Sequence, residues 1–352
     1  MIENLIRTLI ERTGLRDQDI RRITATAPNR YKTYEIPKRS GGMRVIAQPS
    51  REVKFLQRAF IDAVLVNLPV HESATAYRKG MSTLDNAAPH AKSGPILKMD
   101  LKEFFPSIKG GAWRSYCKDR EIFQNPDDLD LSESLLFHRQ RGSRVLRLAI
   151  GAPSSPMVSN VLMYDFDAKV VETVSADRVI YTRYADDLTF SGPRTGHLVN
   201  VKRQVAKIIR DLPYPNLDIN DAKTTYVTKK FSRNITGLTL SNDGRITIGR
   251  QNKREIAAGV KNFLFGKLSD DGVKTLAGRI SYSMSVEPSF VDLLRKRYGE
   301  EPIKFICQYG AVLVNDPIAR ARKREEAMRE KIARRFQRKT PPASPPEGSL
   351  KL

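Results

Sequence analysis

Two adjacent aspartates, Asp186 and Asp187, are the residues of this sequence with the clearest capacity for chemistry. They stand between two β-prone runs, residues 179–184 and 188–190, which predicts a half-buried hairpin tip. Neighbouring carboxylates repel each other unless a cation or water neutralises them. An ordinary solvated turn is the alternative interpretation of an acidic pair, and the apolar flanks on both sides favour the hairpin tip.

A third carboxylate, Asp100, follows the apolar run at residues 95–99. Divalent cations such as Mg²⁺ prefer oxygen ligands, and two such ions about 4 Å apart need several carboxylates on neighbouring strands. A pair of Mg²⁺ ions lowers the pKa of an attacking hydroxyl and stabilises a departing pyrophosphate. This chemistry requires neither His nor Cys, which agrees with only 4 His and 2 Cys in the chain. The carboxylates therefore predict a two-metal site.

Short apolar runs predict the strands that must position these carboxylates. They cover residues 95–99, 178–184 and 234–240, and the last leads through an Asn-Asp-Gly turn into a partner run at 245–248. Helical patterns lie between the runs. The sequence therefore predicts an α+β fold.

The N-terminal part predicts helices around a second strand pair. Apolar residues recur at helical spacing over residues 2–10, which differs from the basic region and apolar block of a secretory signal. Runs 34–37 and 43–46 flank a basic turn with two glycines, residues 38–42, which is typical of a hairpin. A long helix is expected over residues 52–67.

Composition points to a polyanionic partner. The 352 residues include 61 Lys plus Arg against 39 Asp plus Glu, a net charge of +22. Such an excess destabilises a compact chain by self-repulsion, so nucleic acid is the leading candidate partner. An anionic membrane surface is second, but no apolar run approaches spanning length and no lipidation signal occurs. Two distant cysteines argue against a disulfide framework and fit a reducing cytoplasm.

Helical patterns dominate the C-terminal part. They cover residues 252–264, 271–284 and 288–298. Beyond residue 316 the sequence predicts a basic helix followed by a Pro-rich disordered tail, for which a solvated appendage is as good an interpretation as a binding role.

Three motifs together resemble a reverse transcriptase, specifically the bacterial retron type. YADD at residues 184–187 resembles the family's YxDD hairpin, and KMDLKEFF at 98–105 resembles the strand that carries its first catalytic Asp. GAPSSP at 151–156, followed by Ser159 and Asn160, resembles the loop and helix that cover the nascent base pair. NAAPH at 86–90 and ITG at 235–237 resemble the NAxxH and VTG motifs of retron enzymes, with Ile in place of Val.

The resemblance implies a right-hand polymerase with fingers, an antiparallel palm sheet and a helical thumb. By this likeness residues 1–95 form the N-terminal helix and fingers, and 96–249 form the palm, with a finger insertion near 109–149. Residues 250–316 form the thumb, and 317–352 are the basic helix and tail. No segment resembling an RNase H, endonuclease or maturase extension follows, which argues against a retroviral or group II intron enzyme.

The resemblance also implies roles at the reaction centre. Asp100 and Asp186 would ligate both Mg²⁺ ions, with Asp187 beside them and the carbonyl of Leu101 as a further ligand. Lys223 matches a lysine near the leaving pyrophosphate, where a general acid would speed departure; a surface lysine is an equal alternative.

Further positions are expected to bind the incoming dNTP. Phe105 matches the aromatic steric gate that selects dNTPs over rNTPs, with an ordinary core Phe as the alternative. Arg44 is a candidate triphosphate clamp, with Lys38 less certain, against solvated hairpin charges. Gly151 would let the backbone approach the base pair, or serve a structural turn. Tyr184 would pack near the primer end, or within the strand.

RNA contacts are expected at two places. Asn86 and His90 would hold RNA or brace the fold, and bracing is the usual role of an isolated His. In the thumb, several basic residues could grip an RNA hairpin through phosphate and 2′-OH contacts, although each could be a solvated charge. These are Lys253, Arg254, Lys261, Lys267, Arg279, Arg295 and Arg297.

The retron likeness implies an enzyme that copies part of a structured noncoding RNA into single-stranded DNA from an internal guanosine 2′-OH. It implies a branched product joined by a 2′,5′ linkage, and antiphage defence with a separate effector protein. A group II-like or diversity-generating enzyme that extends a 3′-OH primer is one alternative. An RNA-binding scaffold with an idle palm is another, which the presence of all three carboxylates disfavours.

Overall fold

The computed structural model describes residues 2–38 and 41–315 and divides into two compact units. One unit ends at Thr247 and the other begins at Ile248. The basic helix and Pro-rich tail expected beyond residue 316 lie outside the described residues. Helices and antiparallel strands alternate in the first unit, which confirms the α+β prediction.

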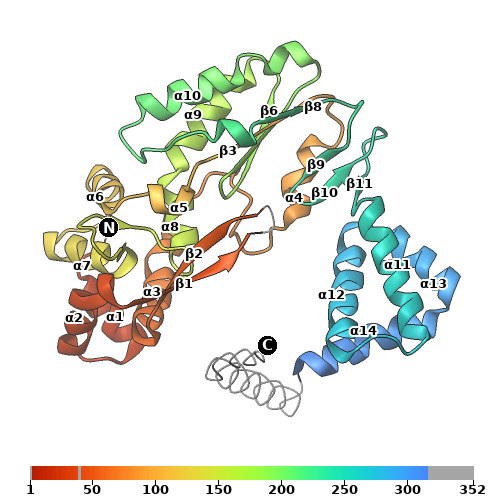
Figure 1. Cartoon of the computed structure of the whole chain (residues 1–352). Helices are drawn as coiled ribbons and strands as arrows, with labels where there is room; N and C mark the ends of the chain where they lie inside the picture. Colours follow the sequence, from red (N-terminus) through yellow and green to blue (C-terminus); the bar gives the residue numbers. More distant parts are fainter. Residues whose placement is uncertain (1, 39–40, 316–352) are drawn as a thin grey trace, which may run out of the picture. The chain divides into compact units, whose positions relative to one another are not determined.

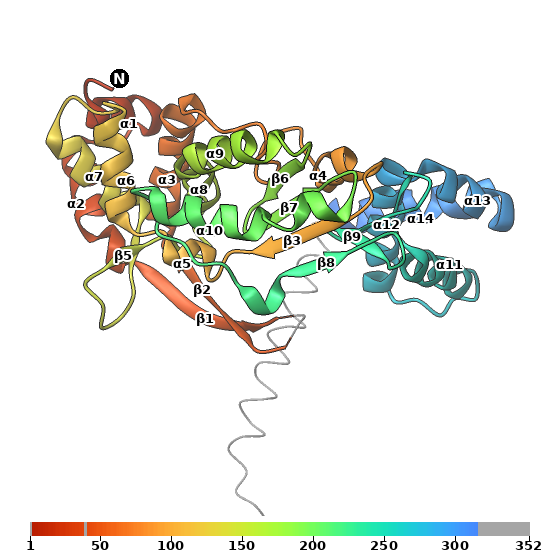
Figure 2. The ribbon, with the colours of Figure 1, turned by 90° about the horizontal axis from the view of Figure 1, so that it is seen from above.

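A four-stranded antiparallel sheet forms the centre of the first unit (Figure 2). Its order is β6-β7-β3-β8. The strands are β3 (Ile96–Asp100), β6 (Ile180–Tyr184), β7 (Asp187–Ser191) and β8 (Thr225–Val227). Strand β3 thus lies between β7 and β8, although β7 follows it by more than eighty residues, and this non-local pairing brings distant motifs together.

The sheet has one apolar and one polar face. Side chains alternate along a strand, so Leu97 of β3 and Phe190 of β7, which are Cα partners, share a face. This face belongs to the same hydrophobic cluster as helices α9 (Tyr164–Ser175) and α10 (Val201–Asp211), which lie side by side on it (Figure 1). The opposite face carries the carboxylates.

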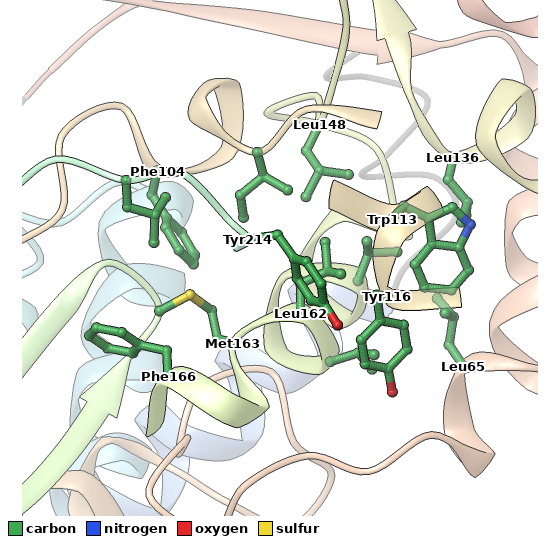
Figure 3. Packing of buried hydrophobic residues seen from close by; sticks show 14 of the residues in the cluster. Leu65, Phe104, Trp113, Tyr116, Leu136, Leu148, Leu162, Met163, Phe166 and Tyr214 are labelled. Atoms are coloured by element: carbon green, nitrogen blue, oxygen red, sulfur yellow. The ribbon is translucent and has the colours of Figure 1, made fainter. Parts of the chain in front are cut away.

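The N-terminal helices pack with a helix pair from the middle of the chain. They are α1 (Leu5–Thr13), α2 (Asp17–Thr26), α3 (Arg51–Ala63), α6 (Gly110–Asp119) and α7 (Pro126–Leu136). The buried carboxylate of Asp128 accepts a hydrogen bond from the free N–H of Leu5 at 2.9 Å, which satisfies the start of α1. Figure 3 shows the core beside them, in which Trp113 and Tyr116 lie close to Leu65.

A long hairpin carries the basic turn. Strands β1 (Tyr31–Pro37) and β2 (Met43–Pro49) pair along their whole length, as expected from the sequence. Helix α3 ends at Ala63 and is followed by a short 3₁₀ turn, η2 (Leu65–Asn67), so the helix expected over 52–67 is interrupted at Val64.

Short elements connect these parts. They are η1 (Ala27–Asn29), α4 (Thr83–Ala87), η3 (Ala88–His90), α5 (Phe104–Ser107), β4 (His138–Arg139), β5 (Leu146–Arg147), α8 (Ser155–Leu162), η4 (Thr195–Leu198) and η5 (Asp221–Lys223). Pro156 lies in the first turn of α8, where a helix needs no N–H from it.

The expectation of one strand over residues 234–240 is wrong. The chain turns at Thr236 and Gly237, which have φ of 46° and 84°. Strands β9 (Arg233–Ile235) and β10 (Leu238–Leu240) are therefore antiparallel neighbours, and β11 (Ile246–Thr247) completes a three-stranded sheet. Gly237 makes the turn possible because a residue without Cβ adopts a left-handed conformation at little cost.

The second unit is helical. It contains α11 (Arg250–Leu264), α12 (Asp270–Val286), α13 (Pro288–Tyr298) and α14 (Glu300–Asn315). Ile256, Ile280, Val291 and Ile306, one from each helix, share a separate hydrophobic cluster. Within the described part of the chain, no helix combines the length and apolarity that crossing a membrane requires.

Candidate active site

The three aspartates meet at one end of the central sheet. Asp100 and Asp187 are Cα partners in the β3–β7 ladder, and the N–H of Leu101 donates to the carbonyl of Asp186 at 3.0 Å. Directly opposed residues project to the same face of a sheet. The structure therefore confirms that the lone aspartate and the doublet converge.

A tight turn presents the doublet. Tyr184 and Asp187 pair across the hairpin, so that Ala185 and Asp186 form a two-residue loop between β6 and β7. Ala185 has a φ of 59°, a left-handed conformation that is uncommon for a residue with a Cβ. The predicted half-buried hairpin tip is confirmed: Ala185 is buried, Asp186 is partly buried, and Asp187 is partly open to solvent at the end of the strand.

Burial and mutual repulsion disfavour the ionised forms of the doublet. Burial raises the pKa of Asp187 to about 6, and the charges of Asp186 and Asp100 add to the effect. Burial also raises the pKa of Asp186, with a contribution from Asp100. A bound cation would reverse both effects, because it stabilises the charged carboxylates.

Lys223 and Asn220 hold the third carboxylate. The Lys223 ammonium lies 3.0 Å from Asp100 Oδ1 and donates to Oδ2 at 3.1 Å, although its side chain is largely exposed. The amide of Asn220 donates to Asp100 Oδ1 at 3.0 Å, and its backbone N–H donates to the Asp100 carbonyl at 2.8 Å. Asn220 was not predicted as a site residue, and its only sequence signal is its position three residues before Lys223.

The oxygen donors of the three aspartates are of the type that divalent metal ions prefer. Over residues 2–38 and 41–315, no three His, Cys, Asp or Glu side chains are grouped closely enough to hold an ion. The ammonium of Lys223 neutralises Asp100 instead. Oxygen ligands on two adjacent strands, with the Leu101 backbone between Asp100 and the Asp186 carbonyl, are nevertheless the type that Mg²⁺ prefers.

Phe105 lies in an aromatic row with Phe104 and Tyr77. It is half-buried in α5, with its ring centroid 5.5 Å from that of Phe104 and 6.2 Å from that of Tyr77. Tyr77 interacts electrostatically with Asp186, Tyr184 and Arg44. No periodicity or motif in the sequence singles out Tyr77.

The remaining predicted dNTP contacts lie around the hairpin β1–β2. Arg44 and Lys38 are exposed, and the positive charge of Arg44 lowers the pKa of Asp186 against the larger effect of burial. Gly151 has a φ of 122°, and a Cβ there would lie 3.0 Å from the Ala47 carbonyl oxygen. Gly151 therefore allows the backbone to lie close to β2. This contact favours a structural role for Gly151 over contact with the base pair.

The expectation that Asn86 and His90 contact RNA is corrected. Both side chains are fully buried. His90 Nδ1 lies 2.7 Å from Ser191 Oγ and its Nε2 lies 2.8 Å from Thr182 Oγ1, so the imidazole links β6 and β7. Asn86 accepts a hydrogen bond from Thr75 and donates to Thr236 at 3.5 Å. These contacts favour the bracing alternative, because neither side chain is accessible to a ligand.

The basic residues of the helical unit fall into two groups. Three are engaged in ion pairs: Lys253 with Glu287 at 2.5 Å, Arg279 with Glu255 at 2.8 Å, and Arg295 with Asp292 at 3.0 Å. The others are exposed on the helices and on the α11–α12 connection. They are Arg254, Lys261, Lys267 and Arg297.

Comparison with known proteins agrees with the site. The family described as reverse transcriptase (RNA-dependent DNA polymerase) matches residues 36–240. The chain is 36% identical to the retron Ec83 reverse transcriptase of Escherichia coli over 281 residues, which cover 79% of this chain and 90% of that protein. It is 30% identical to the retron Ec86 reverse transcriptase of E. coli over 315 residues, which cover 86% of this chain and 93% of that protein.

More distant similarity is also found. The retron Mx65 reverse transcriptase of Myxococcus xanthus is 30% identical over 286 residues, which cover 76% of this chain and 64% of that protein. Among solved structures, Candida albicans telomerase in complex with a TWJ fragment of telomeric RNA gives a TM-score of 0.46 at 14% identity, over 79% of this chain and 55% of that chain. That structural likeness is too weak to carry an argument.

Proposed function

The chain belongs to the reverse transcriptase family, in its retron branch, and we propose that it copies a structured noncoding RNA into branched, RNA-linked single-stranded DNA. It is an RNA-directed DNA polymerase with the α+β right-hand fold of that family. One observation carries the proposed chemistry: the register that sets Asp100 opposite Asp187, with the Asp186 carbonyl bonded to Leu101.

The proposed parts of the hand follow the chain. Residues 1–95 form the N-terminal helix and fingers, 96–249 the palm with a finger insertion near 109–149, and 250–316 the thumb. The break between the two compact units at Thr247 and Ile248 supports a thumb that begins close to residue 250.

In the proposed mechanism the chain mainly positions charge. Two Mg²⁺ ions, held by Asp100, Asp186, Asp187 and the Leu101 carbonyl, would supply Lewis-acid activation of the attacking hydroxyl and of the leaving pyrophosphate. Asp100 and Asp187 keep fixed positions because a strand ladder joins their backbones. Lys223, whose ammonium lies 3.0 Å from Asp100 Oδ1, would give a proton to the leaving group.

Binding of the dNTP is proposed to use residues on three sides of the carboxylates. Arg44 would hold the triphosphate with Lys38 nearby, because a guanidinium binds phosphate oxygens through two parallel hydrogen bonds. The ring of Phe105 would lie against the sugar and leave no room for a 2′-OH. Tyr184 would pack near the primer end, since its side chain lies on the same face as Asp187.

The priming group and the biological setting are the finer parts of the proposal. We infer priming from a guanosine 2′-OH and a cytoplasmic role in antiphage defence with a separate effector protein. Both rest on similarity to retron enzymes. The net charge of +22 supports an RNA partner of considerable size.

The experiment that tests the proposed chemistry is DNA synthesis on the copurifying RNA with Mg²⁺ and dNTPs. Asp186→Asn should lower the rate by at least about 10³-fold while RNA affinity is kept, because metal-assisted charge stabilisation contributes several kcal/mol. Asp243→Asn, which changes an exposed acid in the β10–β11 turn, is the matched control. RNA binding by the wild type without DNA synthesis would establish an idle scaffold, and equal, measurable rates for wild type and Asp186→Asn would exclude Asp186 from the catalytic site.

A second measurement separates the priming hypotheses. Debranching enzyme should cleave the RNA–DNA joint of the product if the linkage is 2′,5′. A joint that resists debranching and yields to alkali shows extension of a 3′-OH, as in group II-like or diversity-generating enzymes.

A further inference from the structure

Tyr77 has an unusual backbone and a position that the proposed function does not explain. Its φ is 63°, a left-handed conformation that is rare for a bulky residue, and its side chain is 48% exposed. Residues held in such conformations persist only where surrounding contacts impose them, and they concentrate at functional sites. The contacts around Tyr77 therefore indicate what its conformation serves.

The segment before Tyr77 is fixed to the edge of the central sheet. The N–H of Arg183 donates to the Ser73 carbonyl at 2.7 Å, and the N–H of Thr75 donates to the Arg183 carbonyl at 2.8 Å. Ala74 thereby forms a parallel bridge with Arg183, next to the hairpin of the aspartate doublet. The side-chain amide of Asn160 then donates to the Ala76 carbonyl at 2.8 Å. Backbone and side-chain hydrogen bonds thus hold residues 73–76 in place before the chain turns at Tyr77.

A buried arginine holds the amide of Asn160 in turn. The Arg183 guanidinium is fully buried and donates to both carboxylate oxygens of Asp167, at 2.9 Å and 2.7 Å. Its Nη1 donates to Asn160 Oδ1 at 3.1 Å and to the Ala185 carbonyl at 3.3 Å. One charged group thus fixes both the turn that presents Asp186 and the loop that presents Tyr77.

This arrangement brings the ring of Tyr77 to Phe105. The two ring centroids are 6.2 Å apart with an interplanar angle of 34°. Such a tilted pair is an attractive contact, and it restricts the rotamers of both rings. The electrostatic neighbours of Tyr77 include Arg44 and Asp186, which belong to the proposed dNTP and metal site.

We propose that Tyr77 is a positioning residue for sugar selection, which packs on the exposed side of Phe105 and holds that ring against the sugar of the incoming nucleotide. The proposal rests on the proposed gate role of Phe105. Without the Tyr77 ring, Phe105 could rotate away and admit a 2′-OH, so discrimination between dNTPs and rNTPs would fall while DNA synthesis continued.

The test measures kcat/KM for one dNTP and for the matching rNTP with the full-length protein on a primed RNA template. Phe105→Ala should lower the dNTP-to-rNTP ratio by about tenfold or more, and Tyr77→Ala should lower it in the same direction by a comparable factor. Tyr77→Phe keeps the ring and should keep the wild-type ratio. In Phe105→Ala/Tyr77→Ala the second change should add nothing, because Tyr77 acts through Phe105.

Control variants separate this role from general damage. Phe231→Ala removes another exposed aromatic ring, in the turn after β8, and should leave the ratio unchanged. A wild-type ratio for Tyr77→Ala beside a lowered ratio for Phe105→Ala overturns the role of Tyr77 and keeps the gate. A wild-type ratio for Phe105→Ala overturns both the gate role of Phe105 and the positioning role of Tyr77. If Tyr77→Ala does not fold, loss of discrimination in the folded Tyr77→Phe overturns the proposal, since the ring is still present there.

Discussion

At the scale of single residues, the site consists of acids that need a positive partner. Asp100 has one in Lys223, whereas burial and neighbouring charge raise the pKa values of Asp186 and Asp187. The lysine and the proposed Mg²⁺ ions therefore compete for Asp100, and binding of metal would free the ammonium for the leaving group.

Lys223→Gln tests this role. We expect single-turnover incorporation to slow by about 10²-fold or more, as for loss of a general acid, with little change in dNTP KM. Lys202→Gln, which removes an exposed lysine paired with Asp221 at 2.8 Å, should behave as wild type. A pyrophosphate-release step that is equally fast in Lys223→Gln and wild type would show that Lys223 is only a surface charge.

At the scale of elements, buried polar side chains join the strands and helices around the site. His90 links β6 and β7 from the polar face of the sheet, and Arg183 joins β6 to α9 and α8 from the apolar face. Polar groups in such places stabilise one arrangement of elements, because any other arrangement leaves them buried without partners.

The burial of His90 predicts a pH-dependent stability. Burial lowers the pKa of His90 from 6.5 to about 4, so between these pH values the unfolded chain binds a proton that the folded chain does not. The free energy of unfolding should therefore be unaffected above pH 6.5 and fall by about 3 kcal/mol in total as the pH drops to about 4.

Urea unfolding at several pH values measures this dependence, with His90→Gln as the comparison. The variant has no imidazole to protonate, so its curve should be flatter than that of wild type between pH 6.5 and 4. Parallel curves for the two proteins would assign the acid sensitivity to other groups.

The buried ion pair predicts a large loss on removal of one partner. Asp167→Asn leaves the Arg183 charge without compensation and should lower the free energy of unfolding by about 3–5 kcal/mol. Asp165→Asn, two residues earlier in α9, removes only a partly exposed pair with Arg120 and should cost at most about 1 kcal/mol. Similar unfolding midpoints for both variants would contradict the structural importance of the buried pair.

At the scale of the whole molecule, positive charge is the dominant feature. The whole sequence has a net charge of +22. In the described part of the helical unit, Arg254 and Arg297 are exposed, and no described acid forms an ion pair with either. Contacts to RNA phosphates release counterions, so the affinity of such a protein falls steeply as salt concentration rises.

Removal of exposed charges from the helical unit should change this salt dependence. For Arg254→Ala/Arg297→Ala we expect weaker binding of the copurifying RNA and a slope of log K against log salt reduced by about 1.5. Arg12→Ala/Arg22→Ala removes two exposed charges from α1 and α2 and is the control. Fluorescence anisotropy at several salt concentrations gives both slopes, and equal slopes for the two double variants would exclude a specific RNA contact by the helical unit.

The sequence by itself determined the family and the α+β class, and it singled out Asp100, Asp186 and Asp187 as the candidate metal ligands. These follow from local signals: apolar runs that end at acids, a YADD turn between β-prone segments, and short motifs in the family's order. Each of these signals lies within a few consecutive residues and does not depend on contacts between distant segments.

Only the tertiary structure decided which distant residues meet. The pairing of β3 with β7, the insertion of His90 between Thr182 and Ser191, and the contact of Tyr77 with Phe105 all join segments far apart in sequence. The burial of Asn86 likewise depends on neighbours from other segments. Local propensity contains no information about such neighbours, because packing and hydrogen bonding across the fold select them.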